Sequence, residues 1–386
     1  MKPSALLWVL TPVFCATAAQ NGSAQNASAQ ASPSPKDLLQ AATAAQQKGD
    51  LKIAIQDFRR ALALQPDLVE AQIGLGTALT AAGDFDGAID VDRHALQSAP
   101  NNPELRTGLG VAYYRKGDLP QARREFEAVH AAHPDDVNAA VLLAFTFNKL
   151  HRETDTVALL TPLEKGHESN LDIQYALGYA LMMSGRPADG LARVEKVAAA
   201  RHAADVWMLA ASARFELKQF KESLTDARHA LEANPSFPGV HTLVGQSFYA
   251  NGNIEEAVRE FQVALRQDPS DFTANLYLGI IRFDDHDLDS ARPLLELALS
   301  IQPQHPLARL EVARLRNMQG DTTQALSILE DLVKSDPDWL DPHVDLAALY
   351  YKLHRPDDGQ RERDVVKRLQ QVQQSHGPRT AQPPSQ

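Results

Sequence analysis

The sequence predicts an all-α protein built from a stack of small helical units, and periodic columns of proline, glycine and Asp or Asn carry that prediction. The proline recurs with a constant period of about 34 residues, a length typical of supersecondary units that stack on one another. The gap between Pro134 and Pro235 is one residue short of three periods. A glycine lies half a period before most of these prolines, and Asp or Asn usually follows it. The prolines are Pro66, Pro100, Pro134, Pro235, Pro269, Pro303 and Pro337.

Each unit is predicted to run helix, turn, helix, stop. The glycine stands where a helix can end in the left-handed conformation, which glycine adopts at the least cost. The Asp or Asn after it is placed to cap the second helix. Small residues recur in both helices, so the two can approach closely and fill the remaining space with larger apolar side chains. The small positions include Gly76, Gly110, Gly245 and Gly279 in the first helix and Ala88, Ala122, Ala257 and Ala291 in the second.

These columns resemble the tetratricopeptide repeat family. The resemblance implies a right-handed α-solenoid of about ten helix-turn-helix repeats, which would cover residues 35–372. Each repeat would bury its apolar face only against its neighbours. The expected repeat starts are Pro35, Val69, Pro103, Val137, Leu171, Ala204, Pro238, Phe272, Pro306 and Leu340.

The pattern is irregular at 137–203. Glu168 stands at a proline position, and Pro187 and Gly190 fall inside the expected second helix of the fifth repeat. One residue has been lost between the glycine position of the fifth repeat and that of the sixth. Two explanations stay open: drift in a tolerant repeat, or a hinge that serves a partner.

Both ends of the chain differ from the repeats. Residues 1–19 combine a basic start, a short apolar run and small residues, which is typical of a signal peptide. Cys15 could instead carry a lipid anchor, but the bulky Phe14 before it disfavours that reading. Residues 20–34 and 373–386 are rich in polar residues and proline, so we expect a disordered leader and tail. The protein is therefore expected to be periplasmic or secreted, with membrane contact only through an uncleaved leader.

Charge and motifs exclude several function classes. The 386 residues carry a formal net charge of −11, and no stripe of Lys and Arg is present, so we expect no nucleic-acid partner. No His-Glu-x-x-His, phosphate-binding glycine loop or nucleophile elbow occurs. Two clusters resemble metal sites, but both fall where the repeat explains them: Glu127, His130 and His133 in a last helical turn, and Asp284 to Asp287 at a glycine-and-cap turn. We expect no metal, no cofactor and no catalytic residue.

The resemblance implies that the first helices line a concave groove, into which the residue four after the small glycine points. Such a stripe could bind an extended peptide or an amphipathic helix, or it could pack neighbouring repeats, and both readings stay open. The positions at which related modules clamp acidic C-termini are mostly apolar here, which favours a less charged ligand. The column reads Tyr114, Asn148, Met182, Phe215, Tyr249, Phe283, Asn317 and Tyr351, with Phe145 and Tyr179 one turn earlier.

The sequence as a whole predicts a non-enzymatic protein-interaction scaffold, exported to the cell envelope. Its partners would be other proteins or peptides, expected among envelope machinery. A carbohydrate-binding solenoid in polysaccharide secretion is the alternative, because aromatic side chains also stack on sugars. A metal-dependent enzyme is the least favoured alternative.

Overall fold

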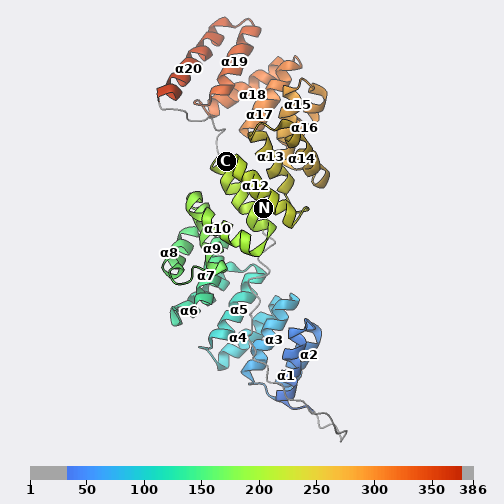
Figure 1. Ribbon diagram of the computed structural model, residues 1–386, viewed down its shortest axis with the longest axis vertical. Helices are drawn as coiled ribbons and strands as arrows, with labels where there is room; N and C mark the ends of the chain where they lie inside the picture. The colour runs from blue at the N-terminus through green and yellow to red at the C-terminus, as the bar shows by residue number, and fades with distance from the viewer. Residues whose placement is uncertain (1–32, 376–386) are drawn as a thin grey trace. The chain divides into compact units, whose positions relative to one another are not determined.

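The computed structural model describes residues 33–375, and in this range it contains twenty α-helices and no strand. The helices divide between two compact units, unit 1 up to Arg201 and unit 2 from His202. Within each unit, consecutive helices lie side by side (Figure 1). The odd-numbered helices are the first helices of the ten repeats, and the even-numbered ones are the second helices.

Each unit contains five helix pairs. Unit 1 contains α1 (Pro35–Gln47), α2 (Leu51–Leu64), α3 (Val69–Ala82), α4 (Phe85–Ser98), α5 (Pro103–Lys116), α6 (Leu119–Ala132), α7 (Val137–Lys149), α8 (Glu153–Glu164), α9 (Leu171–Met183) and α10 (Pro187–Arg201). Unit 2 contains α11 (Ala204–Glu216), α12 (Phe220–Ala233), α13 (Val240–Ala250), α14 (Ile254–Gln267), α15 (Phe272–Asp284), α16 (Leu288–Ile301), α17 (Pro306–Met318), α18 (Thr322–Ser335), α19 (Leu340–Lys352) and α20 (Pro356–Ser375).

The predicted repeat starts coincide with the first residues of the first helices in every repeat except the seventh. There α13 begins at Val240 instead of Pro238, because Gly239 adopts a left-handed φ of 78° just before it. The predicted end of the repeats at 372 lies three residues before the end of the last helix. Helix α20 continues to Ser375, since its glutamine-rich end contains no glycine or proline before Gly377. The predicted signal peptide at 1–19, most of the leader and the tail from 376 lie outside the described residues.

All ten turns between paired helices contain a residue in the left-handed conformation, as the glycine column predicts. Six turns use the glycine, and four use a residue for which this conformation is costly. The Asp that follows caps the next helix in several repeats, as where Asp118 accepts a hydrogen bond from the Gln121 amide. The stacking of the repeats therefore imposes the turn even without glycine. The four exceptions are His151, Lys218, His286 and His354, with φ between 55° and 63°.

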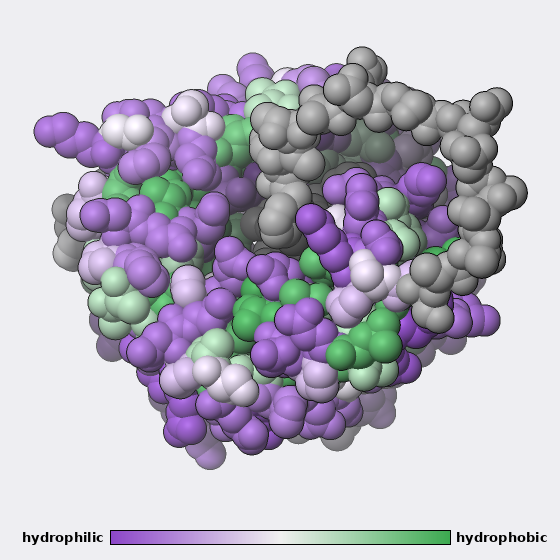
Figure 2. Space-filling view, turned by 90° about the horizontal axis from the view of Figure 1, so that it is seen from below, coloured by the Kyte–Doolittle hydropathy of each residue, from purple (hydrophilic) through white to green (hydrophobic). Residues whose placement is uncertain are grey.

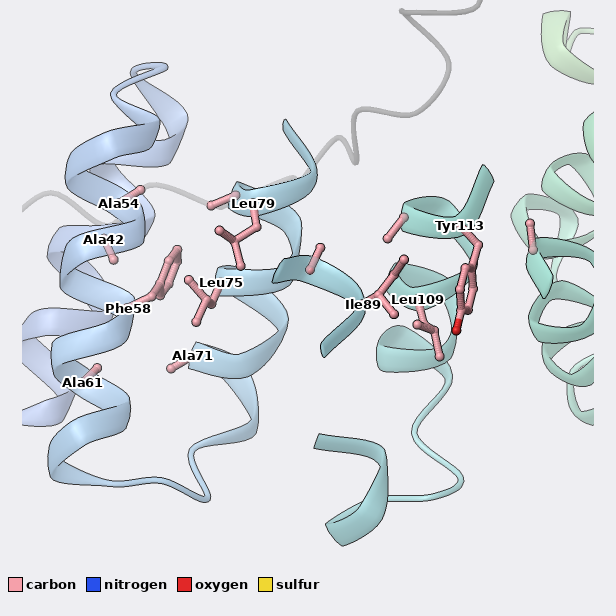
Figure 3. Packing of buried hydrophobic residues seen from close by; sticks show 14 of the residues in the cluster. Ala42, Ala54, Phe58, Ala61, Ala71, Leu75, Leu79, Ile89, Leu109 and Tyr113 are labelled. Carbon is pink, nitrogen blue, oxygen red and sulfur yellow. The ribbon is translucent and has the colours of Figure 1, made fainter. Parts of the chain in front are cut away.

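The small positions bring the paired helices close together. A Cβ atom on Gly110 would lie 2.6 Å from the ring of Phe126, and one on Gly245 would lie 2.7 Å from the ring of Phe261. In Figure 3 the ring of Phe58 points from α2 towards α3. The large aromatic residue of the second helix thus fills the space that the missing side chain leaves.

A polar side chain holds the proline turn between several repeats, and the periodic pattern did not predict it. This residue lies six positions after the proline and donates a hydrogen bond to the proline carbonyl oxygen. The proline carbonyl oxygen lies in a turn and not inside a helix, so a side-chain donor satisfies it, and the bond ties each first helix to the end of the preceding repeat. The pairs are Gln72 with Pro66 (2.9 Å), Arg106 with Pro100 (2.9 Å), Asn275 with Pro269 (3.0 Å) and His343 with Pro337 (3.1 Å).

An ion pair joins the second helices of the irregular fourth and fifth repeats. Both carboxylate oxygens of Glu164 in α8 accept hydrogen bonds from the guanidinium of Arg193 in α10, each at 2.8 Å. This bidentate pair holds the pKa of Glu164 below its ordinary value. Pro187 belongs to the second helix of the fifth repeat, as expected, and it is the first residue of α10, where a missing amide costs nothing.

Candidate functional site

The aromatic column of unit 1 is partly a packing feature. Phe145 and Met182 are buried, and Phe145 packs against Tyr175 with ring centroids 6.2 Å apart. Tyr114 and Tyr179 are partly buried. The Tyr114 hydroxyl has no hydrogen-bond partner among the described residues, and burial raises the pKa of this residue to about 12. In unit 1 the exposed edges of the two tyrosines are thus what a ligand could reach.

The column of unit 2 is more accessible. Phe215 and Tyr249 are partly buried, each against an aromatic neighbour: Phe220 at 5.1 Å and Tyr277 at 5.2 Å, both edge to face. Phe283 is partly buried and packs against the apolar core that α15, α16 and α17 form. Tyr351, in α19, is exposed. The packing fixes these rings in place while leaving part of each in solvent.

The two asparagines of the column link consecutive first helices. The Asn148 side-chain amide donates to the Ala176 carbonyl oxygen at 3.0 Å, and the Lys352 ammonium donates to the Asn317 side-chain oxygen at 2.8 Å. These contacts join α7 to α9 and α17 to α19. The structure thus gives part of the column a packing role, and binding by its exposed edges stays a prediction.

A charged cluster lies beside the column in unit 2, and sequence reasoning missed it. The Arg314 guanidinium donates to Glu311 at 2.8 Å and to Asp345 at 2.7 Å. Glu311 is buried; burial, together with the nearby charges of Asp284 and Asp345, raises its pKa to about 7 even though Arg314 opposes the shift. The signal was present, because Glu311 and Asp345 are one full period apart and thus occupy the same position in consecutive repeats.

The two sequence clusters that resembled metal sites occupy structural positions. His286 is a left-handed turn residue, and Asp287 after it caps α16 by accepting a hydrogen bond from the Ser290 amide at 3.1 Å. His130 belongs to the last turn of α6, and His133 is the residue that caps its end. Within residues 33–375, no group of three or more His, Cys, Asp or Glu side chains is arranged to hold a metal ion.

Comparison with known proteins agrees with this architecture. Models described as tetratricopeptide repeat match residues 39–103, 79–144, 175–238, 244–306 and 282–347. The chain belongs to the tetratricopeptide repeat family. Proteins built of this repeat bind other proteins or peptides, and the family is generally non-enzymatic. The chain thus has a fold that is typical of protein-interaction scaffolds.

Individual relatives are distant. The human protein O-mannosyl-transferase TMTC3 is 27% identical over 142 residues, which are 36% of this chain and only 16% of the length of that protein. A tetratricopeptide repeat protein from Parabacteroides merdae superposes with a TM-score of 0.49 and 14% identity, over 69% of this chain and 98% of its own. YrrB, described as a tetratricopeptide repeat protein with an unusual peptide-binding site, superposes with a TM-score of 0.42 and 20% identity. The match covers 47% of this chain and 95% of YrrB. These likenesses concern the fold alone.

One face of the molecule is largely polar (Figure 2). Figure 2 shows a mostly hydrophilic face on which apolar residues form small separate patches. None of the helices between residues 33 and 375 combines the length and the apolar character that crossing a membrane requires.

Proposed function

We propose that this tetratricopeptide protein is a non-enzymatic scaffold that binds an extended peptide or an amphipathic helix of a partner protein along the face of its first helices. The observation that carries the proposal is the half-buried aromatic column, above all Tyr249, whose ring is fixed by neighbours yet accessible at its edge. Rigid aromatic rings lose little conformational entropy on binding, so they serve well as anchors.

The arrangement of the first helices supports an elongated ligand. Consecutive first helices contact one another directly, as α3 and α5 do in unit 1 and α13, α15, α17 and α19 do in unit 2. Within unit 2 their side chains therefore form a continuous surface, on which the column repeats once per helix. A peptide or helix lying across these helices would meet one rung from each repeat.

The test uses peptides selected on the full chain from a random peptide library, with affinities measured by fluorescence anisotropy. We expect Tyr249→Ala to weaken selected peptides about tenfold, because the ring is a central anchor. Ile254→Ala is the matched control, since Ile254 is 40% exposed but lies on the second helix α14. Equal losses in the two variants, or none in either, would contradict the groove assignment. If the chain binds an oligosaccharide probe and Tyr249→Ala abolishes that binding, the carbohydrate-binding alternative is favoured instead.

The proposal places the scaffold outside the cytoplasm, with partners among the machinery of the cell envelope. The support is the composition of residues 1–19, which combines the charge, apolar run and small residues of a signal peptide. We expect the mass of the protein recovered after export to be lower by the mass of a segment ending at Ala18 or Ala19. An intact N-terminus in the cytoplasmic fraction would rule out this location.

A further inference from the structure

We propose that the last repeat contains a pH-sensitive clasp, in which the doubly protonated ring of His343 holds α20 against α19 and loosens it as the pH rises. The clasp consists of His343 in α19, Glu362 in α20 and the carbonyl group of Pro337 in the turn before α19. It contains no residue of the aromatic column and is independent of peptide binding.

Both ring nitrogens of His343 face an acceptor. The Nδ1 atom lies 2.5 Å from a carboxyl oxygen of Glu362, and the Nε2 atom lies 3.1 Å from the Pro337 carbonyl oxygen. A carbonyl oxygen cannot donate, so Nε2 carries a proton. The short contact at Nδ1 needs a second proton, because without it a nitrogen lone pair would face the carboxylate. The pair of His343 and Glu362 therefore holds one proton more than a neutral imidazole and an ionised carboxylate.

The third repeat makes the same two bonds with a permanent cation. Arg106 occupies the position of His343, six residues after a proline and nineteen before a glutamate. Its guanidinium donates to the Pro100 carbonyl oxygen at 2.9 Å and to Glu125 at 3.0 Å. Arginine is always protonated in proteins, whereas histidine changes its charge near neutral pH. In the last repeat, the cation that makes these bonds can thus be lost.

The seventh repeat has a histidine at the same position but without the second bond. The Nδ1 atom of His241 lies 2.7 Å from a carboxyl oxygen of Glu260. The Pro235 carbonyl oxygen accepts instead from the Gln267 side chain, at 3.5 Å. A neutral ring can keep the single bond to Glu260, because its one proton can stay on Nδ1. His241 therefore provides a matched control for His343.

The attachment of α20 relies on polar contacts. This helix packs against α19, and Leu369 is the one buried side chain among those described in α20. Val365 and Val366 are only partly buried. His343, by contrast, is 5% exposed, so water does not readily replace its bonds when one of them is lost. Loss of the proton from this buried pair should therefore weaken the hold of α19 on α20.

The other charged groups on the elements around α19 do not bond to the ring. Within residues 33–375, Glu362 is the one charged group bonded to His343. Arg309 and Arg314 of α17 are bonded to Asp331 and to the pair Glu311 and Asp345, Arg361 of α20 is bonded to Asp358, and Arg363 lies over the Tyr351 ring. Lys334, Asp336, Asp338 and Asp341 add further charge around the turn. Burial raises the pKa of Glu311 to about 7, so this group also titrates near neutral pH and needs its own control.

NMR of the full chain labelled with nitrogen-15 histidine observes the ring directly. We expect both ring nitrogens of His343 to carry a proton at about pH 6, and one of them to lose it as the pH is raised to about 9. A bare ring nitrogen on His343 at about pH 6, in the folded protein, would overturn the proposal.

Hydrogen exchange followed by mass spectrometry, corrected for the intrinsic exchange rate, measures how firmly α20 is held. We expect the protection of α20 in the wild type to fall about tenfold between about pH 6 and about pH 9. His343→Arg, which copies Arg106, should keep that protection nearly constant. His241→Arg, the matched control, and Glu311→Gln should both show the fall of the wild type.

Glu362→Gln keeps the test decisive if His343→Arg does not fold. The glutamine amide can donate to a bare Nδ1 atom, so a neutral His343 ring keeps both of its bonds and the pH dependence should disappear. The proposal is wrong if the protection of the wild-type α20 does not change with pH. It is also wrong if the fall persists in His343→Arg or Glu362→Gln, and a fall that only Glu311→Gln abolishes would assign the effect to Glu311.

Discussion

At pH 7 the variant Asp92→Asn is expected to be more stable than the wild type by about 4 kcal/mol, and the gain should fall in unit 1. Burial raises the pKa of Asp92 from 3.8 to about 8. Each pH unit between the unfolded-state pKa and pH 7 then costs the wild type about 1.4 kcal/mol of folding free energy. Asparagine has nearly the same shape but never ionises, so it avoids this cost.

The position of Asp92 explains the size of the effect. It occupies the column that holds Phe58 and Phe126 in the neighbouring repeats, and it is only 2% exposed. A Cβ atom on Gly76 would lie 2.3 Å from one carboxyl oxygen of Asp92, and one on Gly108 would lie 3.1 Å from the other. The second of these oxygens, Oδ2, has no hydrogen-bond partner within residues 33–375. A carboxylate enclosed in this way loses its hydration without compensation.

The stability contribution of Asp92 has a defined dependence on pH. The folded pKa lies above the unfolded one, so between about pH 4 and pH 8 the folded state binds a proton that the unfolded state releases. Stability from this group is therefore greatest at the acid end and falls as pH rises. The difference between Asp92→Asn and wild type should grow by about 1.4 kcal/mol per pH unit between pH 5 and pH 7.

Urea unfolding followed by circular dichroism at pH 5, 6 and 7 measures this difference. Asp90→Asn, on the exposed side of the same helix, is the control and should follow the wild type. Trp207 and Trp339 lie in unit 2, so their fluorescence transition should shift less than the dichroism signal. Asp92→Phe tests the apolar nature of the position and should stabilise the chain too, because Gly76 faces residue 92 as Gly110 faces Phe126. A pH-independent difference for Asp92→Asn would show that the carboxyl group is solvated.

The fold could be predicted from the sequence because the tetratricopeptide pattern recurs in every repeat. The same steric demand, a left-handed turn residue or a small residue at a helix crossing, returns once in every repeat, so single exceptions such as His286 do not hide it. Asp92 was missed for the opposite reason. When a repeat position is interpreted from its most frequent residue types, a single polar residue goes unnoticed. Only the three-dimensional packing shows that no described side chain pairs with the Oδ2 atom of Asp92.

The candidate site could be predicted only in part. Periodicity placed the aromatic column on the first helices, but it could not separate a buried rung such as Phe145 from an accessible one such as Tyr249. That distinction depends on the neighbouring side chains, which vary between repeats. The cluster around Arg314 depends on contacts between three consecutive first helices, α15, α17 and α19. Its sign in the sequence was the pair Glu311 and Asp345 at one repeat position, in a column otherwise of mixed residue types.

Gly190→Ala is expected to destabilise unit 1 by about 2 kcal/mol, because α9 and α10 touch at this residue. A Cβ atom on Gly190 would lie 2.4 Å from the Gly178 carbonyl oxygen and 2.5 Å from the Met182 side chain. The first of these contacts is with backbone, which cannot rotate away. The helices must therefore separate, and alanine's better helix propensity, up to about 1 kcal/mol, offsets only part of the loss.

Gly359→Ala in α20 is the matched control for this prediction. A Cβ atom there would lie 2.9 Å from the ring of Tyr351, but that ring belongs to an exposed side chain that can turn aside. The control should be neutral or stabilising, since the gain in helix propensity meets no backbone contact. Urea midpoints from circular dichroism compare the two variants. If Gly190→Ala proves as stable as Gly359→Ala, α9 and α10 can move apart freely, and the irregular fifth repeat is then a compliant point in unit 1 and not a close-packed one.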